Sequence, residues 1–281
     1  MHKYSMLEKL LFLSSSLNTE KLRRAIEGKT VLITGASSGI GEQVAYMLAD
    51  FQVHLILVAR KVDKLLAVKD QIEKKEASVS IFCADLRSDE EMKGLLSFIH
   101  RLPNGLDIVV SNAGLSINRP ISQSLDRFHD FTRTMAINYF APVQLMLSLI
   151  PILEKNKGQV INISTINALL LPFPNWAGYQ ASKSAFDTWF RSAAPELNAM
   201  EIATASIYLP LVKTPMILPT IAYEKMPAMC PNHVAKIICK TMYTKRKTYK
   251  PWWLIFGEVA SILFRGIYER LIPKIFQSRG K

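Results

Sequence analysis

The stretch Thr34-Gly35-Ala36-Ser37-Ser38-Gly39-Ile40-Gly41 decides the fold of this 281-residue chain. It follows an apolar run, Val31–Ile33, and precedes a segment with the pattern of a helix, Glu42–Leu48. A strand, a glycine-rich turn and a helix N-terminus in this order hold the pyrophosphate of a dinucleotide, because glycines let the backbone come close and the helix end offers free N–H groups. A glycine-rich turn without a ligand is the much weaker alternative, since both flanking patterns are present. The cofactor contacts expected in this stretch are Gly35, Ser37, Ser38, Gly39, Ile40 and Gly41.

Apolar runs with the character of strands recur after this stretch. They lie at residues 53–58, 79–83, 108–110, 160–163 and 203–209. The segments between them are long enough for helices, and this alternation predicts an α/β fold with a Rossmann-like, doubly wound parallel sheet. With 49% hydrophobic residues the chain can bury one substantial core, so we expect a single domain.

Polar residues stand where the predicted strands end. They are Arg60, Asp85, Asn112 and Ser164. An open α/β sheet binds its ligands at the carboxyl ends of the strands. The sequence therefore predicts a binding site along this edge of the sheet.

Tyr179 and Lys183 are four residues apart in the run Tyr179-Gln180-Ala181-Ser182-Lys183. On a helix this separation is about one turn, or roughly 6 Å, so a phenol and an ammonium share one face. A nearby positive charge lowers the pKa of a phenol from its usual value of about 10, which makes Tyr179 a candidate general acid/base. The pair alone is weak evidence, because the same spacing also occurs on solvated helix faces.

Taken together, these motifs resemble those of the short-chain dehydrogenase/reductases. The shared elements, in the family's order and approximate spacing, are Gly35-x3-Gly39-x-Gly41, Asp85-Leu86, Asn112-Ala113-Gly114, Asn138, Ser164 and Tyr179-x3-Lys183. The resemblance covers about residues 28–245 and is specific, because six separate elements coincide. Two departures are small: Ser111 stands where an asparagine is common, and Pro210-Leu211 replaces the usual Pro-Gly.

The resemblance implies a role for each catalytic residue. Tyr179 donates a proton to a carbonyl, and Ser164 hydrogen-bonds the oxygen of that carbonyl. Lys183 holds the nicotinamide ribose and lowers the pKa of Tyr179, while Asn138 holds a water of the proton relay. Besides Tyr179 and Lys183, the implied cofactor contacts are Asp85, Leu86, Asn112, Ala113, Gly114 and Thr214. For Asp85, an N-cap of the following helix is an alternative of nearly equal weight.

The choice of cofactor follows from charge at the end of the second predicted strand. An acidic residue there binds the ribose 2′-OH and repels a 2′-phosphate, whereas an arginine accepts the phosphate. The chain has Ala59-Arg60-Lys61 and no carboxylate before Asp63, so we expect NADP(H). A solvated basic turn at Arg60 is the alternative.

The substrate is expected to be hydrophobic. Residues 126–131, 138–140 and 209–220 resemble the branch of the family whose reductase domains act on long-chain acyl groups. The expected lid, residues 214–230, is rich in flexible apolar side chains: Met216, Ile217, Leu218, Ile221, Met226 and Met229. Residues 169–174 and Trp176 are the expected opposite wall, although ordinary core packing explains either set almost equally well. A lone His129 faces either the substrate or, more commonly for such a residue, the surface.

Both ends of the chain extend beyond this fold. Residues 1–27 predict an amphipathic helix, residues 28–250 the NADP-binding domain, and residues 251–281 a basic aromatic amphipathic tail. Tryptophans beside a basic cluster suit an anionic membrane surface. Glu258 interrupts the apolar run well before the roughly 20 residues of a spanning helix. The alternative is that the tail packs on the enzyme's own core or on a second subunit and covers the substrate pocket.

Charge and cysteine content limit the partners. The formal charge of +12 suits either a membrane surface or nucleic acid, but no nucleic-acid motif is present, so no nucleic-acid partner is expected. The three cysteines have no metal-ligand spacing and make an odd number, which predicts no metal and a reducing compartment. We therefore expect a cytoplasmic protein, peripheral on the cytoplasmic membrane face if the tail binds lipid. The family resemblance implies a homo-oligomer.

The sequence as a whole predicts an NADPH-dependent oxidoreductase that transfers hydride to a carbonyl of a hydrophobic, long-chain acyl or lipid substrate. Within enzymes, the alternative is a fatty acyl thioester reductase that releases an aldehyde. From another class, the alternative is a catalytically silent cofactor-binding regulator or scaffold at the membrane. The intact set Asn138, Ser164, Tyr179 and Lys183 argues against a silent protein.

Overall fold

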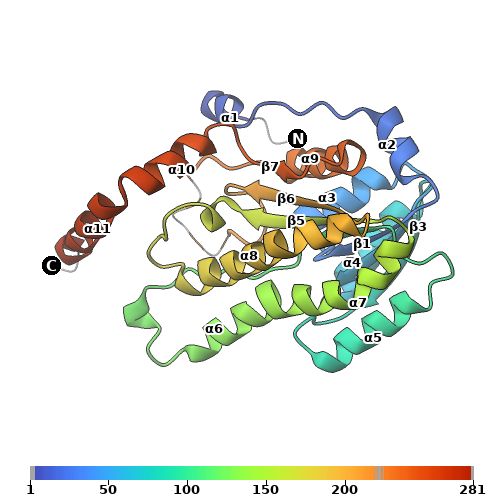
Figure 1. Ribbon diagram of the computed structural model, residues 1–281, viewed down its shortest axis with the longest axis horizontal. Helices are drawn as coiled ribbons and strands as arrows, with labels where there is room; N and C mark the ends of the chain where they lie inside the picture. Colours follow the sequence, from blue (N-terminus) through green and yellow to red (C-terminus); the bar gives the residue numbers. More distant parts are fainter. Residues whose placement is uncertain (1–3, 219, 221–222, 224, 280–281) are drawn as a thin grey trace.

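The computed structural model describes residues 4–218, 220, 223 and 225–279, and it is built around a seven-stranded sheet (Figure 1). The strands are β1 (Thr30–Thr34), β2 (His54–Ala59), β3 (Ser78–Cys83), β4 (Ile108–Ser111), β5 (Gln159–Thr165), β6 (Ala203–Leu209) and β7 (Thr248–Tyr249). Each neighbouring pair is parallel, and the strand order is β3-β2-β1-β4-β5-β6-β7. This confirms the doubly wound parallel sheet. The order reverses between β1 and β4, which is where such a sheet forms its ligand crevice.

Helices cover both faces of the sheet. On one face lie α3 (Gly39–Leu48), α4 (Val62–Ile72) and α9 (Pro231–Thr244), and on the other α5 (Asp89–His100), α7 (Ala141–Lys155) and α8 (Ala177–Ala199). Strands covered in this way are near-continuous apolar runs, because both of their faces are buried. That explains why β1 and β4 are buried along their whole length and why their sequences were recognisable. The two-residue β7 was not predicted, since Thr248–Tyr249 is too short to show a pattern.

A long helical stretch runs beneath the site. It consists of α6 (Phe128–Met135), a π-helical turn η2 (Ala136–Phe140) and α7. Within the described part of the chain, Phe128–Lys155 is the one stretch long and apolar enough to cross a bilayer by length and composition. It packs against α5 and α8 and carries Asn138 in its middle, so it acts here as a layer of the α/β fold.

The N-terminal extension forms two helices, whereas one was predicted. They are α1 (Met6–Leu11) and α2 (Thr19–Ile26), separated by a serine-rich connection. Helix α1 is tied to the segment that follows β6: the Glu8 carboxylate lies 2.7 Å from Lys213 Nζ and accepts a hydrogen bond from the backbone N–H of Ala228 at 3.2 Å. The Tyr4 hydroxyl accepts a further bond from the backbone N–H of Cys230.

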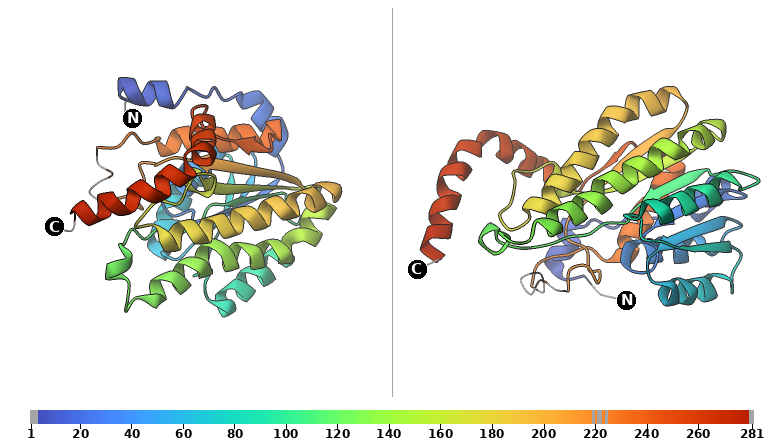
Figure 2. Two further views of the ribbon diagram at one scale, coloured as in Figure 1. Left: turned by 60° about the vertical axis from the view of Figure 1, so that its left-hand side comes forward. Right: turned by 90° about the horizontal axis from the view of Figure 1, so that it is seen from below.

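The C-terminal tail also forms two helices, α10 (Leu254–Leu263) and α11 (Arg265–Arg279). Figure 2 shows them projecting from the edge of the molecule at which α8 begins. They contact the loop after β5, where the backbone N–H of Leu171 donates to Ser261 Oγ at 3.3 Å and the Tyr268 hydroxyl donates to the carbonyl of Pro172. At the start of α10, Trp252 Nε1 donates to the carbonyl of Leu10 at 3.1 Å, which joins the two ends of the chain.

Candidate active site

The glycine stretch forms a tight turn between β1 and α3. Gly35 and Gly39 have φ angles of +68° and +62°, a region that favours glycine. A Cβ on Gly41 would come within 2.5 Å of the Gly35 carbonyl oxygen, so this position also excludes a side chain. The N-cap residue of α3, Ser38, makes no side-chain capping bond, which leaves the first-turn N–H groups uncapped by that side chain and suited to an anionic group. Thr214 lies against this turn, with its methyl carbon 2.9 Å from the place where a Gly39 Cβ would be.

Asn112 and Thr34 join the turn to the end of β4. Asn112 Nδ2 donates to the carbonyl oxygens of Thr34 at 2.9 Å and Gly35 at 3.3 Å. In return, the Thr34 hydroxyl accepts from the backbone N–H groups of Asn112 and Ala113, at 2.9 and 3.0 Å. These bonds hold the Asn112-Ala113-Gly114 backbone beside the glycine turn.

The ends of β2 and β3 bring Arg60 and Asp85 together. Arg60 Nη1 lies 4.0 Å from Asp85 Oδ2 and its side chain is 60% exposed. Arg87, which the sequence analysis missed, binds the Asp85 carboxylate through Nε, at 2.9 and 3.1 Å, and through Nη2, at 2.5 Å. These hydrogen bonds lower the pKa of Asp85.

Two guanidinium groups, those of Arg60 and Arg87, face the Asp85 carboxylate, and the Glu91 carboxylate lies beside them, where it accepts a hydrogen bond from the backbone N–H of Asp85 at 2.8 Å. The N-cap alternative for Asp85 is wrong, since Ser88 caps α5 by accepting a hydrogen bond from the backbone N–H of Glu91. Leu86 lies in the core beneath this group.

Asn138 is buried in the π-helical turn of the long helix. Such turns are rare in proteins, and those that occur often lie at functional sites. Asn138 Oδ1 accepts from the backbone N–H of Leu115 at 2.9 Å, and Nδ2 donates to the carbonyl of Leu115 and to Ser182 Oγ, each at 2.9 Å. The turn thus connects the loop after β4 to α8, one residue before Lys183.

Lys183 and Gly114 meet Asn138 at the same place. A Cβ on Gly114 would lie 3.1 Å from Asn138 Oδ1 and 3.5 Å from Lys183 Nζ. Lys183 Nζ donates to the carbonyl oxygen of Ile163 at 3.1 Å. The structure therefore brings the loop after β4, the π-helical turn, β5 and α8 together around this ammonium group.

Tyr179 lies in the first turn of α8, one turn before Lys183, as the spacing predicted. Its side-chain hydrogen bond is with Thr165, the last residue of β5, and this contact lowers the pKa of the phenol. The larger effect is burial, which raises that pKa above its usual value. The Lys183 ammonium donates to the Ile163 carbonyl, and the expectation that it lowers the pKa of Tyr179 stays a prediction.

The hydroxyl group beside Tyr179 requires a correction to the sequence prediction. Ser164 Oγ donates to Asp187 Oδ1 at 3.2 Å, so the Ser164 side chain is directed at a later turn of α8. Adjacent residues of a strand point to opposite sides, and hence Ser164 and Thr165 cannot both face Tyr179 from a regular strand. The residue that contacts Tyr179 is Thr165, and its hydroxyl has the chemistry that was attributed to Ser164.

Burial also affects Lys183. It lowers the pKa of the ammonium group from its usual value to about 8, and the negative charge of Asp187 opposes this shift. Asp187 is almost fully buried and is held by Ser164 on one oxygen and by Arg191 Nε, 2.9 Å away, on the other. The carboxylate therefore helps to keep the lysine charged.

The segment after β6 places a tyrosine over the site that the sequence analysis did not single out. The ring of Tyr223 stacks on Trp176, with centroids 5.8 Å apart. Burial and, after it, the electrostatic influence of Tyr179 raise the pKa of Tyr223 to about 12, so the two phenols are close. Among the apolar residues of the expected lid, Met229 is fully buried in the core, contrary to the expectation. Ile221 lies outside the described residues. His129 is directed at Asp130, 3.4 Å away.

Comparison with known proteins identifies the family. The family model described as short chain dehydrogenase matches residues 29–223. A protein of Acinetobacter baylyi named fatty acyl-CoA reductase is 41% identical over 243 residues, which cover 86% of this chain and 81% of the relative. A protein of Mycobacterium tuberculosis with the same descriptive name is 37% identical over 212 residues, with coverages of 75% and 72%.

Solved structures have the same fold. L-sorbose reductase from Gluconobacter frateurii, complexed with NADPH and L-sorbose, matches with a TM-score of 0.72 at 24% identity and covers 80% of this chain and 95% of its own. A short-chain dehydrogenase from Sphingobium yanoikuyae in complex with NADPH matches with a TM-score of 0.74 at 20% identity, with coverages of 87% and 95%. With its glycine turn, its Tyr179–Lys183 pair and these relatives, the chain belongs to the short-chain dehydrogenase/reductase family of oxidoreductases.

Proposed function

We propose that this oxidoreductase uses NADPH to reduce the carbonyl of a long-chain acyl substrate, and specifically a fatty acyl-CoA thioester. The observation that carries the proposal is the meeting of Tyr179, Thr165 and Lys183 beside a glycine turn suited to a dinucleotide. The names of the relatives from Acinetobacter baylyi and Mycobacterium tuberculosis support the thioester over other carbonyl compounds.

The cofactor would lie along the carboxyl edge of β1, β2 and β4. The uncapped first turn of α3 would bind the pyrophosphate, and Arg60 and Arg87 would face the adenosine end. Because Asp85 is already paired with Arg87, the guanidinium of Arg60, whose side chain is 60% exposed, would be available to a 2′-phosphate, which favours NADPH. The cofactor complexes of the solved relatives support this choice. When bound, NADPH supplies the hydride that reduces the carbonyl carbon.

The residues of the site would manage the proton and the charge on oxygen. Tyr179 donates its proton to the carbonyl oxygen, and Thr165 hydrogen-bonds the same oxygen. The raised pKa of Tyr179 keeps the phenol protonated at neutral pH, as an acid in the reductive direction must be. For a thioester, the oxygen then returns its proton as the C–S bond breaks, and the leaving thiolate takes up a proton. The products are the aldehyde and free coenzyme A.

A hollow beside the loop after β5 supports an acyl chain as part of the substrate. It has a volume of about 610 Å³ and is bordered on one side by the apolar residues Leu169–Pro172 and on the other by α10 and α11, which contribute Ile262 and Tyr268 and, among charged residues, Glu258, Arg265 and Glu269. This volume is typical of ligand-binding sites. Leu169 is four residues after Thr165, so a chain in this hollow would extend away from the reacting carbonyl.

The test is NADPH oxidation with three substrate sets: fatty acyl-CoA of increasing chain length, the matching free aldehydes, and short ketones. We expect turnover with long-chain acyl-CoA and an aldehyde product identified by mass spectrometry. Turnover of aldehydes alone would reject the thioester and leave a carbonyl reductase. Absence of NADPH binding would reject the whole proposal.

We also propose that the two terminal segments bind an anionic membrane surface. Exposed apolar side chains gather on α10 and α11, and others lie on α1: Ile255, Phe256, Val259, Ile262, Leu263 and Ile267, with Met6, Leu7 and Leu10. The hydrogen bond between Trp252 and Leu10 places these two sets next to each other. Apolar side chains beside arginines and lysines suit the headgroup region of a bilayer.

Vesicle flotation tests this second proposal. A Phe256→Ser/Leu263→Ser variant should lose most of its binding to vesicles that contain phosphatidylserine, because two exposed apolar side chains outside the hollow are removed. The matched control is Leu125→Ser, which removes a side chain that is 85% exposed on another part of the surface. Equal flotation of both variants would contradict the proposal.

A further inference from the structure

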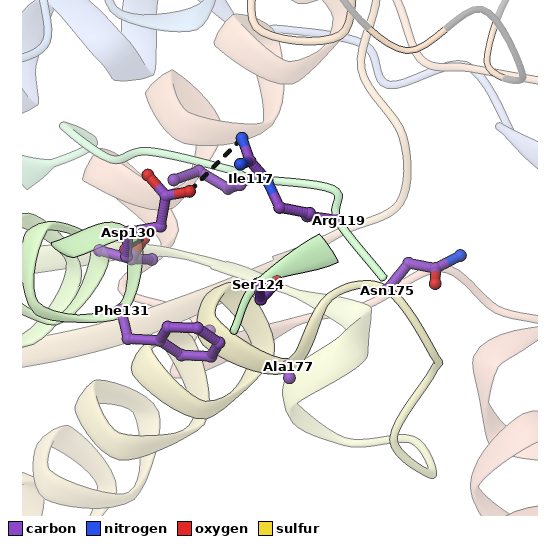
Figure 3. A pocket seen from close by; sticks show the side chains of 9 residues that line it. Ile117, Arg119, Ser124, Asp130, Phe131, Asn175 and Ala177 are labelled. Carbon is purple, nitrogen blue, oxygen red and sulfur yellow. Dashed lines mark hydrogen bonds and ion pairs between the residues drawn. The ribbon is translucent and has the colours of Figure 1, made fainter. Parts of the chain in front are cut away.

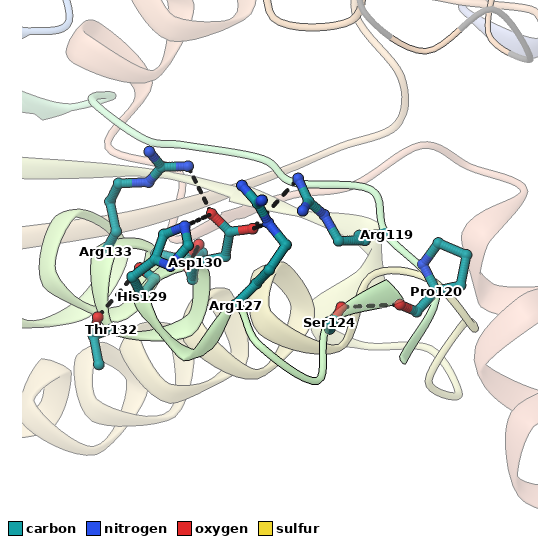
Figure 4. Close-up of polar contacts among 9 residues, drawn as sticks. Arg119, Pro120, Ser124, Arg127, His129, Asp130, Thr132 and Arg133 are labelled. Atoms are coloured by element: carbon teal, nitrogen blue, oxygen red, sulfur yellow. Dashed lines mark hydrogen bonds and ion pairs between the residues drawn. The ribbon is translucent and has the colours of Figure 1, made fainter. Parts of the chain in front are cut away.

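Asp130 on α6 is a buried carboxylate that gathers cationic side chains at the rim of the site (Figure 4). Arg133 Nη2 lies 2.9 Å from Oδ1, while Arg127 Nε and Arg119 Nη2 lie 3.2 and 3.4 Å from Oδ2. Three guanidinium groups and one carboxylate leave two net positive charges. His129 Nε2, 3.4 Å from Oδ1, adds another when it is protonated. We call Arg119, Arg127 and Arg133 the arginine cluster.

The arginine cluster has unused hydrogen-bonding capacity. Each guanidinium has five N–H donors, of which the contacts with Asp130 use only a part. The side chains of Arg127 and Arg133 are 38% and 44% exposed, so their remaining donors are accessible. Asp130 is only 6% exposed, and it therefore acts as a fixed anchor that holds the arginines close together despite their mutual repulsion. Converging guanidinium groups are the preferred protein ligands of phosphate.

The arginine cluster adjoins the catalytic helix. A small cavity is lined by Arg119 and Asp130 on one side and by Ala177 and Gly178 on the other, directly before Tyr179 (Figure 3). The backbone N–H of Arg119 donates to the carbonyl of Asn175 at 2.7 Å, which fastens the arginine to the segment that leads into α8. Arg119 lies in the loop after β4. Nearer to β4, this loop is fixed by the hydrogen bonds between the Leu115 backbone and the Asn138 side chain.

We propose that the arginine cluster binds the phosphate groups of the coenzyme A part of the substrate. This inference rests on the proposed thioester function and adds the recognition site for the carrier. The acyl hollow and the arginine cluster involve different loops, the one after β5 and the one after β4, so chain and carrier would leave the catalytic centre in different directions. A free aldehyde has no phosphate and would not use the arginine cluster.

The test compares binding of coenzyme A, 3′-dephospho-coenzyme A and pantetheine to the full chain by calorimetry, and uses acyl-CoA and the matching aldehyde in steady-state kinetics. Arg127→Gln and Arg133→Gln should each weaken coenzyme A binding about tenfold, the loss expected for one charge-assisted hydrogen bond. They should raise KM for acyl-CoA similarly, and they should leave unchanged the binding of pantetheine, which has no phosphate, and any turnover of the aldehyde that the wild type shows. The preference for coenzyme A over its dephospho form should decrease as well.

Arg23→Gln is the matched control, because Arg23 is also 38% exposed and paired with a carboxylate, that of Glu76 at 3.4 Å, but lies on α2. Thermal unfolding verifies that each variant is folded, and each leaves Asp130 with two arginines. Unchanged coenzyme A affinity in both variants would overturn the inference. Lost binding to phosphatidylserine vesicles with unchanged coenzyme A affinity would also overturn it, and would attribute the arginine cluster to lipid headgroups.

The outcomes separate this inference from the proposed function. Wild-type turnover of acyl-CoA that persists unchanged in the variants would reject the arginine cluster as the carrier site and keep the thioester reductase. If the wild type does not reduce any acyl-CoA, the proposed function fails, and the calorimetric comparison still decides whether the arginine cluster binds coenzyme A.

Discussion

The Ser164 hydroxyl donates a hydrogen bond to the Asp187 carboxylate, 3.2 Å away, on the helix that also carries Tyr179. Asp187 follows Tyr179 by eight residues, or about 12 Å along the axis of α8. Ser164 is thus part of a buried polar group that supports the helix, whereas Thr165 contacts the phenol of Tyr179. Two adjacent hydroxyl residues with different partners should respond differently to substitution.

Thr165→Val should lower kcat by about 10²–10³-fold, because the oxygen of the substrate loses a hydrogen-bond donor at nearly constant side-chain volume. Thr165→Ser should recover most of the activity. Steady-state kinetics with saturating NADPH measure both values. Wild-type kcat in Thr165→Val would exclude Thr165 from the reaction.

Ser164→Ala should keep kcat near its wild-type value and instead lower the free energy of unfolding by about 1–3 kcal/mol, since Asp187 loses a hydrogen bond in a buried position. Urea unfolding measures the change. A large loss of kcat without a loss of stability would return the catalytic role to Ser164, as the sequence first suggested.

Tyr179→Phe removes the proposed acid with little change in volume. We expect NADPH affinity to stay within a few-fold of wild type, and kcat to fall by about 10²–10⁴-fold, as is typical for loss of a general acid. Cofactor fluorescence titration and single-turnover kinetics separate the two effects. Substantial residual turnover in this variant would mean that another group protonates the oxygen.

The sequence was sufficient for the sheet because each of its longer strands is an apolar run between polar ends. It was also sufficient for Tyr179, Lys183 and the glycine turn, whose spacing is local. It assigned the hydroxyl to Ser164 and did not consider Thr165, since only the geometry at the end of β5 sets which hydroxyl turns toward Tyr179.

Contacts between distant segments were the other gap in the sequence prediction. Arg87 became visible only through its ion pair with Asp85, and the arginine cluster only through the folding of the loop after β4 onto α6. Neither the stacking of Tyr223 on Trp176 nor the bond between the two chain ends has a sequence pattern.

Arg60→Asp should lower the preference for NADPH over NADH by about 10–100-fold, because a 2′-phosphate would lose a guanidinium and gain a repelling carboxylate. Arg87 would still neutralise Asp85, so the fold should be unaffected. Arg101→Asp is the control, since it makes the same change of charge at an exposed position after the far end of α5. Equal preference for NADPH in the wild type and Arg60→Asp would show that Arg60 is merely a solvated side chain.

Lys183 should leave a signature in the pH dependence of stability. Burial lowers the pKa of its ammonium group from 10.5 to about 8 in the folded protein. Between these two values the unfolded chain binds more protons than the folded one, so the contribution of this group to the free energy of unfolding rises with pH. Below pH 8 the buried charge opposes folding by its full amount.

Lys183→Met removes the charge and should therefore flatten the rise in stability between pH 8 and 9, a range below the point at which the tyrosines of the unfolded chain ionise. Lys245, whose pKa burial also lowers to about 8, serves as an internal comparison, because Lys245→Met should flatten the same interval without affecting catalysis. Urea unfolding at several pH values measures both slopes. If stability rises with pH equally steeply in the wild type and in Lys183→Met, the ammonium group is solvated. Its pKa would then stay near the ordinary value of 10.5, and Asp187 would not be needed to keep it charged at neutral pH.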